Sequence, residues 1–268
     1  MGTISPSEIA KQLLTAEQNR NTVEPLTTTY PGISVADAYA IQLANIQEKV
    51  AQGATVVGKK IGLTSEAMQK MFHVTTPDYG HLLDSMMHVD GDTISLDGLI
   101  QPRMEAEIGF VLHKELKGPG ITVTDVIDAT AYVIPVLEVV DSRIRDWQIK
   151  FEDTVADNGS SARAILGGKP TSLLDLDLHH IGMIFSRNGE PIATAAGAAV
   201  MGNPIHAVVW LANELGWFDI PLKAGEVILS GALTAAVPVQ AGETYTAQFA
   251  HIGCVTVTFD QGKGTNHE

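Results

Sequence analysis

The sequence predicts an α+β protein whose β-rich core follows a small helical region at the N-terminus. Two segments before residue 53 repeat apolar residues at helical spacing, whereas most apolar runs after residue 99 have the length and composition of strands. Helices and strands do not alternate regularly, which argues against a doubly wound sheet and against a (β/α)8 barrel. We therefore expect a helical cap region over residues 1–53 and a β-rich domain over residues 54–268, which together can behave as one domain.

Capping residues mark the start of the N-terminal helices. The run Ser5–Glu8 supplies a capping serine, a proline at the first helical position and a returning glutamate, which predicts a helix over about residues 6–18. A second helix is expected to begin at Ser34 and to end at Gly53, because apolar residues recur at helical spacing between them. These two helices would form the cap region.

Short apolar runs separated by turn residues predict the remaining elements. A strand over about residues 55–61 precedes a short helix that Thr64 or Ser65 can cap. The pair Asn188–Gly189 is a strong hairpin signal between two apolar runs. The other strands are expected near residues 104–112, 131–140, 162–167, 181–186, 191–196, 226–230 and 244–259.

Composition and charge exclude several classes of partner. The 268 residues carry a formal net charge of −14 that is spread along the chain, which argues against nucleic acid and against an anionic membrane surface. A small anionic substrate would therefore need positive charge from a metal or a lysine. There is no signal-peptide pattern and no run long enough to span a membrane, and the single cysteine, Cys254, is expected to be a packed thiol in a strand. We therefore expect a cytoplasmic protein.

Several common catalytic motifs are absent from the sequence. It has no G-x-G-x-x-G after a strand, no P-loop, no H-E-x-x-H, no G-x-S-x-G and no C-x-x-C. Its nine histidines show no spacing typical of metal ligands. Nucleotide, flavin, zinc and serine-hydrolase functions are therefore disfavoured.

Two glutamates interrupt the apolar strand predicted over residues 104–112. Glu105 and Glu107 are two residues apart, so both side chains point to one face of the strand, while the apolar residues between and after them point to the other. Adjacent carboxylates repel each other unless one is protonated or a cation lies between them. A divalent metal is the simplest remedy, and ligation by oxygen alone favours magnesium, calcium or manganese over zinc.

A third glutamate, Glu138, lies in a second apolar run, where a buried and unpaired charge would be costly. Three glutamates on neighbouring strands would form an open metal site. The alternative is that Glu105 and Glu107 lie on the solvated face of a sheet and that Glu138 pairs with a nearby arginine.

A lysine and an aspartate are candidates for proton transfer. The strand at residues 58–61 directs one lysine to each face. If Lys60 faces the carboxylates it is a cation near the metal, and the charge of the metal could lower its pKa enough for proton transfer. The alternative is that both lysines are solvated. Asp78 lies in a predicted turn over residues 76–80, where an aspartate commonly forms local hydrogen bonds.

Further polar residues follow the strand that carries Glu138. Arg143 either contacts a substrate or pairs with Asp157 in a salt-bridged loop. Ser160, Ser161 and Ser230 offer hydroxyl and amide donors of the kind that hold a carboxylate. These four residues are our candidates for substrate binding: Arg143, Ser160, Ser161 and Ser230.

Six motifs in order along the chain give a specific resemblance. They are Gly58–Thr64, Pro77–Gly80, Pro102–Glu107, Leu137–Trp147, Asp153–Asn158 and Gly225–Gly231. With them the sequence resembles the 2-hydroxypenta-2,4-dienoate hydratases, also called 2-keto-4-pentenoate hydratases, of the fumarylacetoacetate hydrolase superfamily. The resemblance implies a mixed-sheet β-roll of fumarylacetoacetate hydrolase type, with residues 54–268 as the catalytic domain. It also implies a homo-oligomer and is compatible with a complex with the decarboxylase or aldolase of the same pathway.

The resemblance implies roles for individual residues. Glu105, Glu107 and Glu138 occupy the positions of the family's Mg²⁺ or Mn²⁺ ligands, and Lys60 and Asp78 occupy positions implicated in its proton transfers. The implied substrate is a small 2-hydroxy dienoic acid, which gains water to give 4-hydroxy-2-oxopentanoate in the meta-cleavage catabolism of aromatic compounds. One departure is Gly159, where the family commonly has alanine, and it bears on the loop of Ser160 and Ser161.

Four other functions remain open. The nearest is a decarboxylase of 2-oxo-3-hexenedioate (4-oxalocrotonate), although residues 143–147 resemble the hydratases. A hydratase of a longer dicarboxylic analogue is the second, and a C–C hydrolase, which would need a Glu–His pair that activates water, is the third. The fourth is a non-catalytic subunit that stabilises a partner enzyme, against which the retention of three glutamates and Lys60 speaks.

Overall fold

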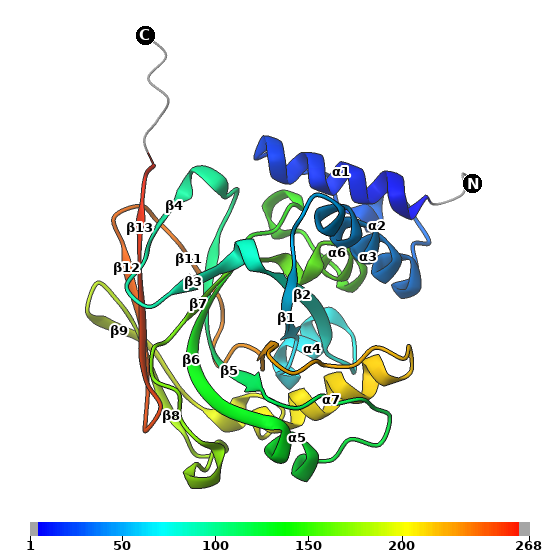
Figure 1. Cartoon of the computed structure of the whole chain (residues 1–268). Coiled ribbons are helices and arrows are strands. Elements are labelled where there is room, and N and C mark those ends of the chain that lie inside the picture. Colours follow the sequence, from blue (N-terminus) through cyan, green and yellow to red (C-terminus); the bar gives the residue numbers. More distant parts are fainter. Residues whose placement is uncertain (1–4, 263–268) are drawn as a thin grey trace.

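The computed structural model describes residues 5–262 and contains two β-sheets, of which the larger lies between the smaller sheet and most of the helices (Figure 1). The larger sheet has eight strands in the order β2-β1-β10-β5-β6-β7-β3, with β11 also paired to β5. The smaller sheet has five strands in the order β4-β13-β12-β8-β9. Three pairs are parallel, namely β1 with β10, β3 with β7 and β4 with β13, so both sheets are mixed.

The strands of the larger sheet are β1 (Val56–Gly62), β2 (Asp78–Leu83), β3 (Met87–Val89), β5 (Arg103–Leu112), β6 (Thr130–Val140), β7 (Ser161–Leu166), β10 (Val227–Leu229) and β11 (Val237–Pro238). Those of the smaller sheet are β4 (Thr93–Ser95), β8 (Gly182–Arg187), β9 (Glu190–Ala196), β12 (Thr244–Phe249) and β13 (Gly253–Asp260). The α-helices are α1 (Pro6–Asn19), α2 (Leu26–Thr29), α3 (Val35–Ala51), α4 (Glu66–Phe72), α5 (Val123–Ala129), α6 (Phe151–Ala156) and α7 (Pro204–Gly216).

The main hydrophobic core lies between the two sheets. Met104 and Phe110 of β5 belong to the same buried cluster as Tyr245 of β12 and Phe259 of β13. Apolar residues on the inner face of each sheet therefore meet across one interface, as they do when two sheets pack face to face. This arrangement, with a helical region at the N-terminus, confirms the α+β fold class.

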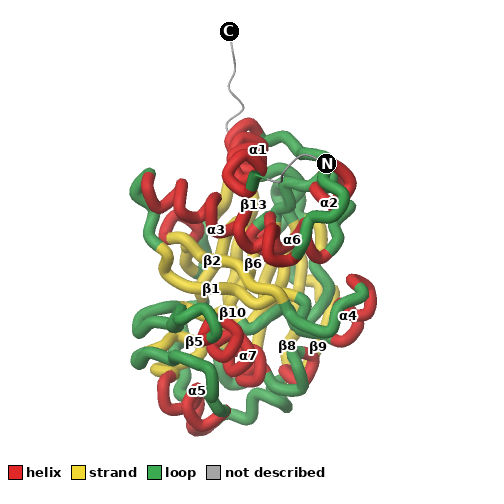
Figure 2. Tube along the Cα trace, turned by 90° about the vertical axis from the view of Figure 1, so that its right-hand side faces the viewer, coloured by secondary structure: helices red, strands yellow, loops and turns green. Residues whose placement is uncertain are grey.

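The N-terminal helices form a second cluster beside the sheet. Ile9 and Leu13 of α1 pack with Ile41 of α3 and with Val155 of α6. Figure 2 shows α1, α2, α3 and α6 together at one end of the molecule, with α5 and α7 at the other. The described part of the chain contains no helix that is both long and apolar enough to cross a membrane.

The predicted helices and most predicted strands are confirmed. Of the two capping residues offered for the short helix α4, Ser65 is the cap, and its hydroxyl accepts a hydrogen bond from the backbone N–H of Met68. Two local predictions are wrong. The run over residues 244–259 forms two strands, because it turns back on itself after β12. Cys254 is exposed, because β13 alternates and its even-numbered residues lie opposite the buried valines.

The segment after Pro77, where we expected a turn, forms the edge strand β2, and this prediction was also wrong. All six of its residues are buried, so the segment lacks the apolar–polar alternation that would have revealed a strand. The segment is a strand because it pairs with β1, a long-range contact that the local sequence does not indicate.

A buried ion pair joins β1 to the turn before β10 and yields a stability prediction. Lys59 Nζ lies 2.9 and 2.8 Å from the two carboxylate oxygens of Glu226. Lys59→Met should lower the free energy of unfolding by about 3–5 kcal/mol, because Glu226 is left buried without its counter-ion. The double variant Lys59→Met, Glu226→Met should regain most of this loss in urea unfolding, and equal losses in the single and double variants would contradict the prediction.

Candidate functional site

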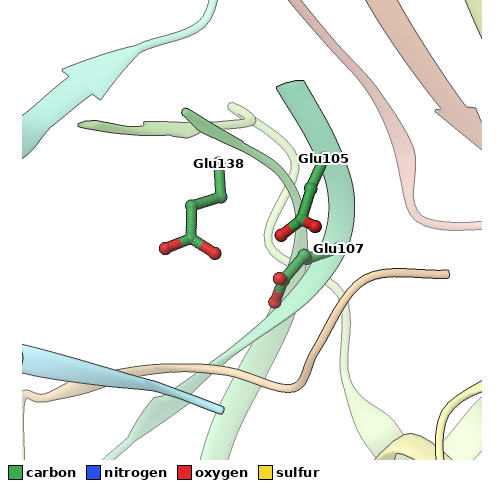
Figure 3. Close-up of side chains that lie close together, drawn as sticks. All are labelled: Glu105, Glu107 and Glu138. Carbon is green, nitrogen blue, oxygen red and sulfur yellow. The ribbon is translucent and has the colours of Figure 1, made fainter. Parts of the chain in front are cut away.

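The pairing of β5 with β6 brings three glutamates together. Glu105 lies directly opposite Glu138 in the antiparallel register, and Glu107 follows on the same face of β5. One carboxylate oxygen from each of the three lies within 4.8 Å of the others, and Figure 3 shows the carboxylates directed toward one another. The cluster that the sequence predicts therefore exists in the fold.

The carboxylates of this cluster are removed from solvent and short of partners. Glu107 is 1% exposed, so the alternative of a solvated face is wrong for this residue, and Glu138 is 0% exposed. Among the described residues, the side chain that forms an ion pair with Glu138 is Lys60 and not the arginine of the alternative. Glu107 accepts one hydrogen bond, at 2.7 Å, from the backbone N–H of Gly231. Within residues 5–262, the other oxygen of Glu107 and both oxygens of Glu138 have no hydrogen-bond partner. Buried anionic oxygens of this kind fit a divalent cation held by oxygen ligands.

The protonation behaviour of the cluster reflects the same shortage of positive charge. Burial and, to a smaller extent, the charges of Glu138 and Asp78 raise the pKa of Glu105 to about 7, although Lys60 acts in the opposite direction. Burial followed by the charges of Glu138 and Glu105 raises the pKa of Glu107 well above its ordinary value. These shifts favour the protonated, neutral form of the carboxyl groups, whereas a bound divalent cation would favour the ionised form.

Lys60 of β1 faces the glutamates. Its ammonium group lies 3.5 Å from Glu138 Oε2 and donates a hydrogen bond of 2.9 Å to the backbone carbonyl of Gly159. The alternative that both lysines are solvated is wrong, because Lys60 is 4% exposed and Lys59 is 3% exposed. Burial favours the neutral amine, but the charges of the surrounding carboxylates, chiefly Glu138, outweigh it and raise the pKa of Lys60. The protein's own carboxylates therefore raise the pKa of Lys60, and the lowering that we expected depends on the positive charge of a neighbouring metal.

Asp78 lies on the same face of the sheet as Lys60. It opens β2 and lies opposite Gly62, two positions from the pair that Lys60 forms with Gly80. The carboxylate fits because residue 62 is a glycine: a Cβ there would lie 2.1 Å from Asp78 Oδ1. Asp78 is buried, and this burial raises its pKa although Lys60 opposes the shift. The sequence signal that we missed is the glycine two residues after Lys60.

The serines predicted to bind substrate differ in their contacts. Ser160 Oγ donates a hydrogen bond to Asp157 at 3.3 Å. The hydroxyls of Ser161 and Ser230 are buried and have no hydrogen-bond partner in the part of the chain that the structure describes. The latter two are therefore better placed than Ser160 to receive a polar ligand.

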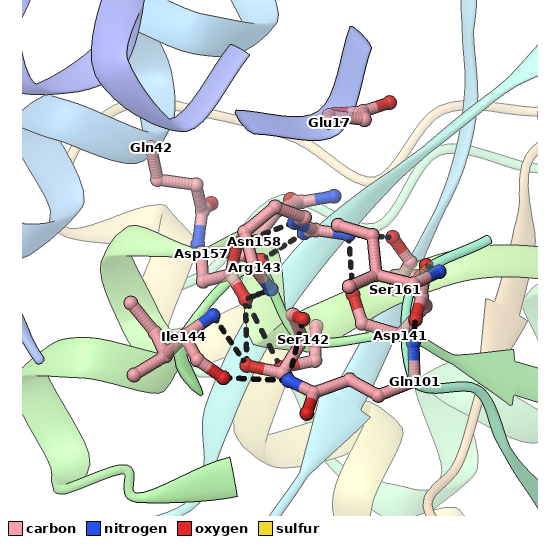
Figure 4. A network of polar contacts seen from close by, with 12 residues as sticks. Glu17, Gln42, Gln101, Asp141, Ser142, Arg143, Ile144, Asp157, Asn158 and Ser161 are labelled. Carbon is pink, nitrogen blue, oxygen red and sulfur yellow. Dashed lines mark hydrogen bonds and ion pairs between the residues drawn. The ribbon is translucent and has the colours of Figure 1, made fainter. Parts of the chain in front are cut away.

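Arg143 is committed to the protein itself. Its Nε lies 2.5 Å from Asp157 Oδ1, its Nη1 donates to the carbonyl of Asp141 at 2.7 Å and its Nη2 donates to the carbonyl of Asp157 at 2.6 Å (Figure 4). Arg143 is buried, and the hydrogen bonds of its guanidinium are made to groups of the protein. This is the salt-bridged loop that the sequence left open, so we revise Arg143 from a substrate-binding residue to one that holds the loop.

His81 lies on the opposite face of the strands and gives a pH-dependent prediction. It is paired with Lys59 in the register, and burial lowers its pKa from 6.5 to about 4. Because the unfolded chain then binds the proton more tightly, stability falls as the pH drops through 6.5 toward 4. Between pH 7.5 and 5.5 this residue should cost roughly 1 kcal/mol, so unfolding curves of His81→Gln should depend less on pH. Parallel pH dependence in the two proteins would contradict the prediction.

The sequence of this chain is similar to those of a known family of enzymes. Residues 42–260 match the family model described as fumarylacetoacetate (FAA) hydrolase C-terminal. A 2-keto-4-pentenoate hydratase of Paraburkholderia xenovorans (strain LB400) is 47% identical over 256 residues, which cover 96% of this chain and 95% of that protein. A 2-hydroxyhexa-2,4-dienoate hydratase of Comamonas testosteroni is 47% identical over 253 residues, covering 94% and 96%.

A solved structure of similar fold is 4-oxalocrotonate decarboxylase from Pseudomonas putida G7, complexed with magnesium and adipate. It has a TM-score of 0.93 and 39% identity, and the match covers 97% of this chain and 100% of that chain. The likeness therefore extends over both sheets and the N-terminal helices.

Proposed function

The chain belongs to the fumarylacetoacetate hydrolase family, and from this premise we propose that it is a hydro-lyase acting on 2-hydroxypenta-2,4-dienoate. The product is 4-hydroxy-2-oxopentanoate, formed in the meta-cleavage catabolism of aromatic compounds. One observation carries the proposal: hydratases of such dienoates are 47% identical over nearly the whole chain. The buried glutamate cluster beside Lys60 supports an enzyme over a non-catalytic subunit, because such a costly arrangement needs a function.

The three glutamates are proposed to hold a divalent cation, with Mg²⁺ or Mn²⁺ as the preferred ion. Support comes from the unpartnered oxygens of Glu107 and Glu138 and from the oxygen-only donor set with Glu105. When bound, such an ion supplies the positive charge that makes a 2-oxo acid more acidic and more electrophilic. The same charge would offset the repulsion within the cluster.

Lys60 and Asp78 are proposed to move the protons of the reaction. The substrate loses its 2-hydroxyl proton and gains a proton at C5, which gives a 2-oxo-3-enoate. Water then adds its hydroxyl to C4 and a proton to C3, so that the product contains one water more than the substrate. Lys60 and Asp78 lie on one face and influence each other's charge, so we assign these transfers to the pair and not to either residue alone.

Ser161 and Ser230 are proposed to bind the substrate carboxylate, with Ser160 nearby. Their support is that the first two hydroxyls are buried and lack partners among the described residues. Donors in such a position orient a carboxylate with little reorganisation. Further proposals that rest on the family are a homo-oligomer, a cytoplasmic location and a complex with the decarboxylase or aldolase of the pathway.

The second candidate function is decarboxylation of 4-oxalocrotonate, which the similarity to the P. putida G7 enzyme favours. That substrate carries a second carboxylate, which would need a cationic partner in the site. Arg143 does not offer one, because its guanidinium is already paired with Asp157. A C–C hydrolase is less well supported, because the register places His81 on the face opposite to Lys60.

A comparison of two substrates separates these functions. Purified protein with Mg²⁺ or Mn²⁺ would be given either 2-hydroxypenta-2,4-dienoate or 2-oxo-3-hexenedioate, and carbon dioxide and product mass would be measured. The hydratase proposal expects hydration of the first compound and no carbon dioxide from the second. Faster release of carbon dioxide from the second compound would favour the decarboxylase.

A further inference from the structure

Three consecutive residues beside Lys60 have a left-handed backbone. The φ angles of Asn158, Gly159 and Ser160 are 57°, 59° and 57°, in the segment that joins α6 to β7. Only one of the three is a glycine, and each other residue pays about 1–2 kcal/mol for this conformation. Such strain persists only where surrounding contacts hold the backbone in place.

The side chain of Asn158 supplies one of these contacts. Its Oδ1 accepts a hydrogen bond of 2.7 Å from the backbone N–H of His81, and its Nδ2 donates one of 2.9 Å to the His81 carbonyl. Because β2 is an edge strand of the sheet, the carboxamide occupies backbone groups that no other strand within residues 5–262 uses. We call this two-bond contact between Asn158 and His81 the Asn158 clamp.

The loop is pressed closely onto β2 at a second point. A Cβ on Gly80 would lie 2.4 Å from the backbone oxygen of Asn158, so only glycine allows this approach. Gly80 is the cross-strand partner of Lys60. The clamp and the glycine therefore fix the loop directly over the position of Lys60.

The consequence is the placement of one carbonyl group. With the turn held in this way, the carbonyl of Gly159 accepts the 2.9 Å hydrogen bond from Lys60 Nζ, and the ammonium group reaches Glu138 at 3.5 Å. On its other side the loop adjoins the ion pair of Arg143 and Asp157 (Figure 4). There the backbone N–H of Asp141 donates a hydrogen bond of 2.7 Å to the Ser160 carbonyl. The Asn158 clamp binds β2, and this strand also contains Asp78.

We propose that Asn158 is a positioning residue: its clamp on His81 holds the left-handed turn whose Gly159 carbonyl orients Lys60 toward the glutamates. This inference rests on the proposed function of the same site. Asn158 acts through Gly159 and Lys60 and does not contact the reacting atoms itself.

The test compares two asparagines that share a conformation. Asn158→Gly removes the clamp, and glycine adopts the positive φ of this position without strain, so any effect of the substitution is not caused by backbone strain. The matched control is Asn188→Gly in the β8–β9 hairpin, where Asn188 also has a positive φ, of 53°, and accepts a hydrogen bond of 2.8 Å from Thr244. We expect Asn158→Gly to lower kcat roughly 10- to 100-fold with KM within about threefold. The control should leave both kinetic constants unchanged.

Amide hydrogen exchange in the absence of substrate reports the clamp independently of turnover. The His81 amide should exchange roughly tenfold faster or more in Asn158→Gly, whereas the Leu82 amide should be little affected. Faster exchange at His81 with unchanged kcat would overturn the positioning role while leaving the hydratase proposal intact. Unchanged exchange at His81 would overturn the clamp itself. A wild-type protein with no turnover would overturn the proposed function, and the positioning role with it.

Discussion

Replacing Glu138 by glutamine is expected to lower kcat/KM for 2-hydroxypenta-2,4-dienoate by about 10³-fold or more. Glu138 is fully buried and lies opposite Glu105. The single positive charge of Lys60, 3.5 Å away, is shared with Glu105 and Glu107, so a divalent cation best accounts for the three carboxylates together. Glutamine has nearly the same shape but lacks the negative charge that attracts a divalent ion. The affinity for Mn²⁺, measured by calorimetry, should therefore fall together with activity.

The thermal stability of Glu138→Gln, with and without Mn²⁺, gives a second readout of the metal site that does not depend on activity. In metal-free buffer, Glu138→Gln should be about as stable as the wild-type protein, because relief of the repulsion within the cluster offsets the loss of the ion pair with Lys60, which keeps Glu105 and Asp78 as neighbouring charges. Addition of Mn²⁺ should raise the Tm of the wild-type protein more than that of the variant. Glu66→Gln is the matched control, since Glu66 is an exposed residue on α4, and it should change neither Mn²⁺ affinity nor activity. Normal Mn²⁺ affinity in Glu138→Gln would contradict the assignment of the ligand.

Replacing Lys60 by methionine is expected to lower kcat by about 10²- to 10⁴-fold, the range for loss of a group that transfers protons. The substitution keeps most of the length of the buried side chain and removes only the ammonium group. Because this group lies 3.5 Å from Glu138, its removal takes positive charge away from the cation site. Lys60→Met should therefore bind Mn²⁺ at least as tightly as the wild-type protein does.

The two variants are thus distinguished by metal affinity, which falls in Glu138→Gln and does not fall in Lys60→Met. The matched control is Lys70→Met, because Lys70 is an exposed lysine on α4 that pairs with the exposed Glu66. Calorimetry and steady-state kinetics on Glu138→Gln, Lys60→Met and Lys70→Met would test both roles together. A Lys60→Met protein that retained wild-type kcat would remove Lys60 from the proposed chemistry.

The grouping of the three glutamates could be predicted because its signal is local. Glu105 and Glu107 share a face by the two-residue period of a strand, and a carboxylate in an apolar run is conspicuous. The position of Glu138 directly across from Glu105 depends on the strand register, which only the structure gives. The predicted grouping of the carboxylates is confirmed, and their binding of a metal stays a prediction.

Asp78 was placed in a turn because a strand buried on both faces has no alternation, and its pairing with β1 is a tertiary effect. The pKa of Lys60 was expected to fall beside a metal, whereas the surrounding carboxylates, chiefly Glu138, raise it; the balance between these charges depends on distances that the sequence does not give. The Asn158 clamp joins residues 77 positions apart, and no local pattern indicates that contact. Residues that act through other residues are thus the hardest to find from sequence.

The central claim is that a divalent cation held by the three glutamates is required to hydrate the dienoate. Its most direct test follows the ultraviolet absorbance of freshly generated 2-hydroxypenta-2,4-dienoate with chelator-treated protein, before and after addition of Mg²⁺ or Mn²⁺, and determines the mass of the product. The account predicts that absorbance is lost only when metal is added and that the product has gained one water. Hydration at the same rate without metal, or no turnover with either ion, would contradict it.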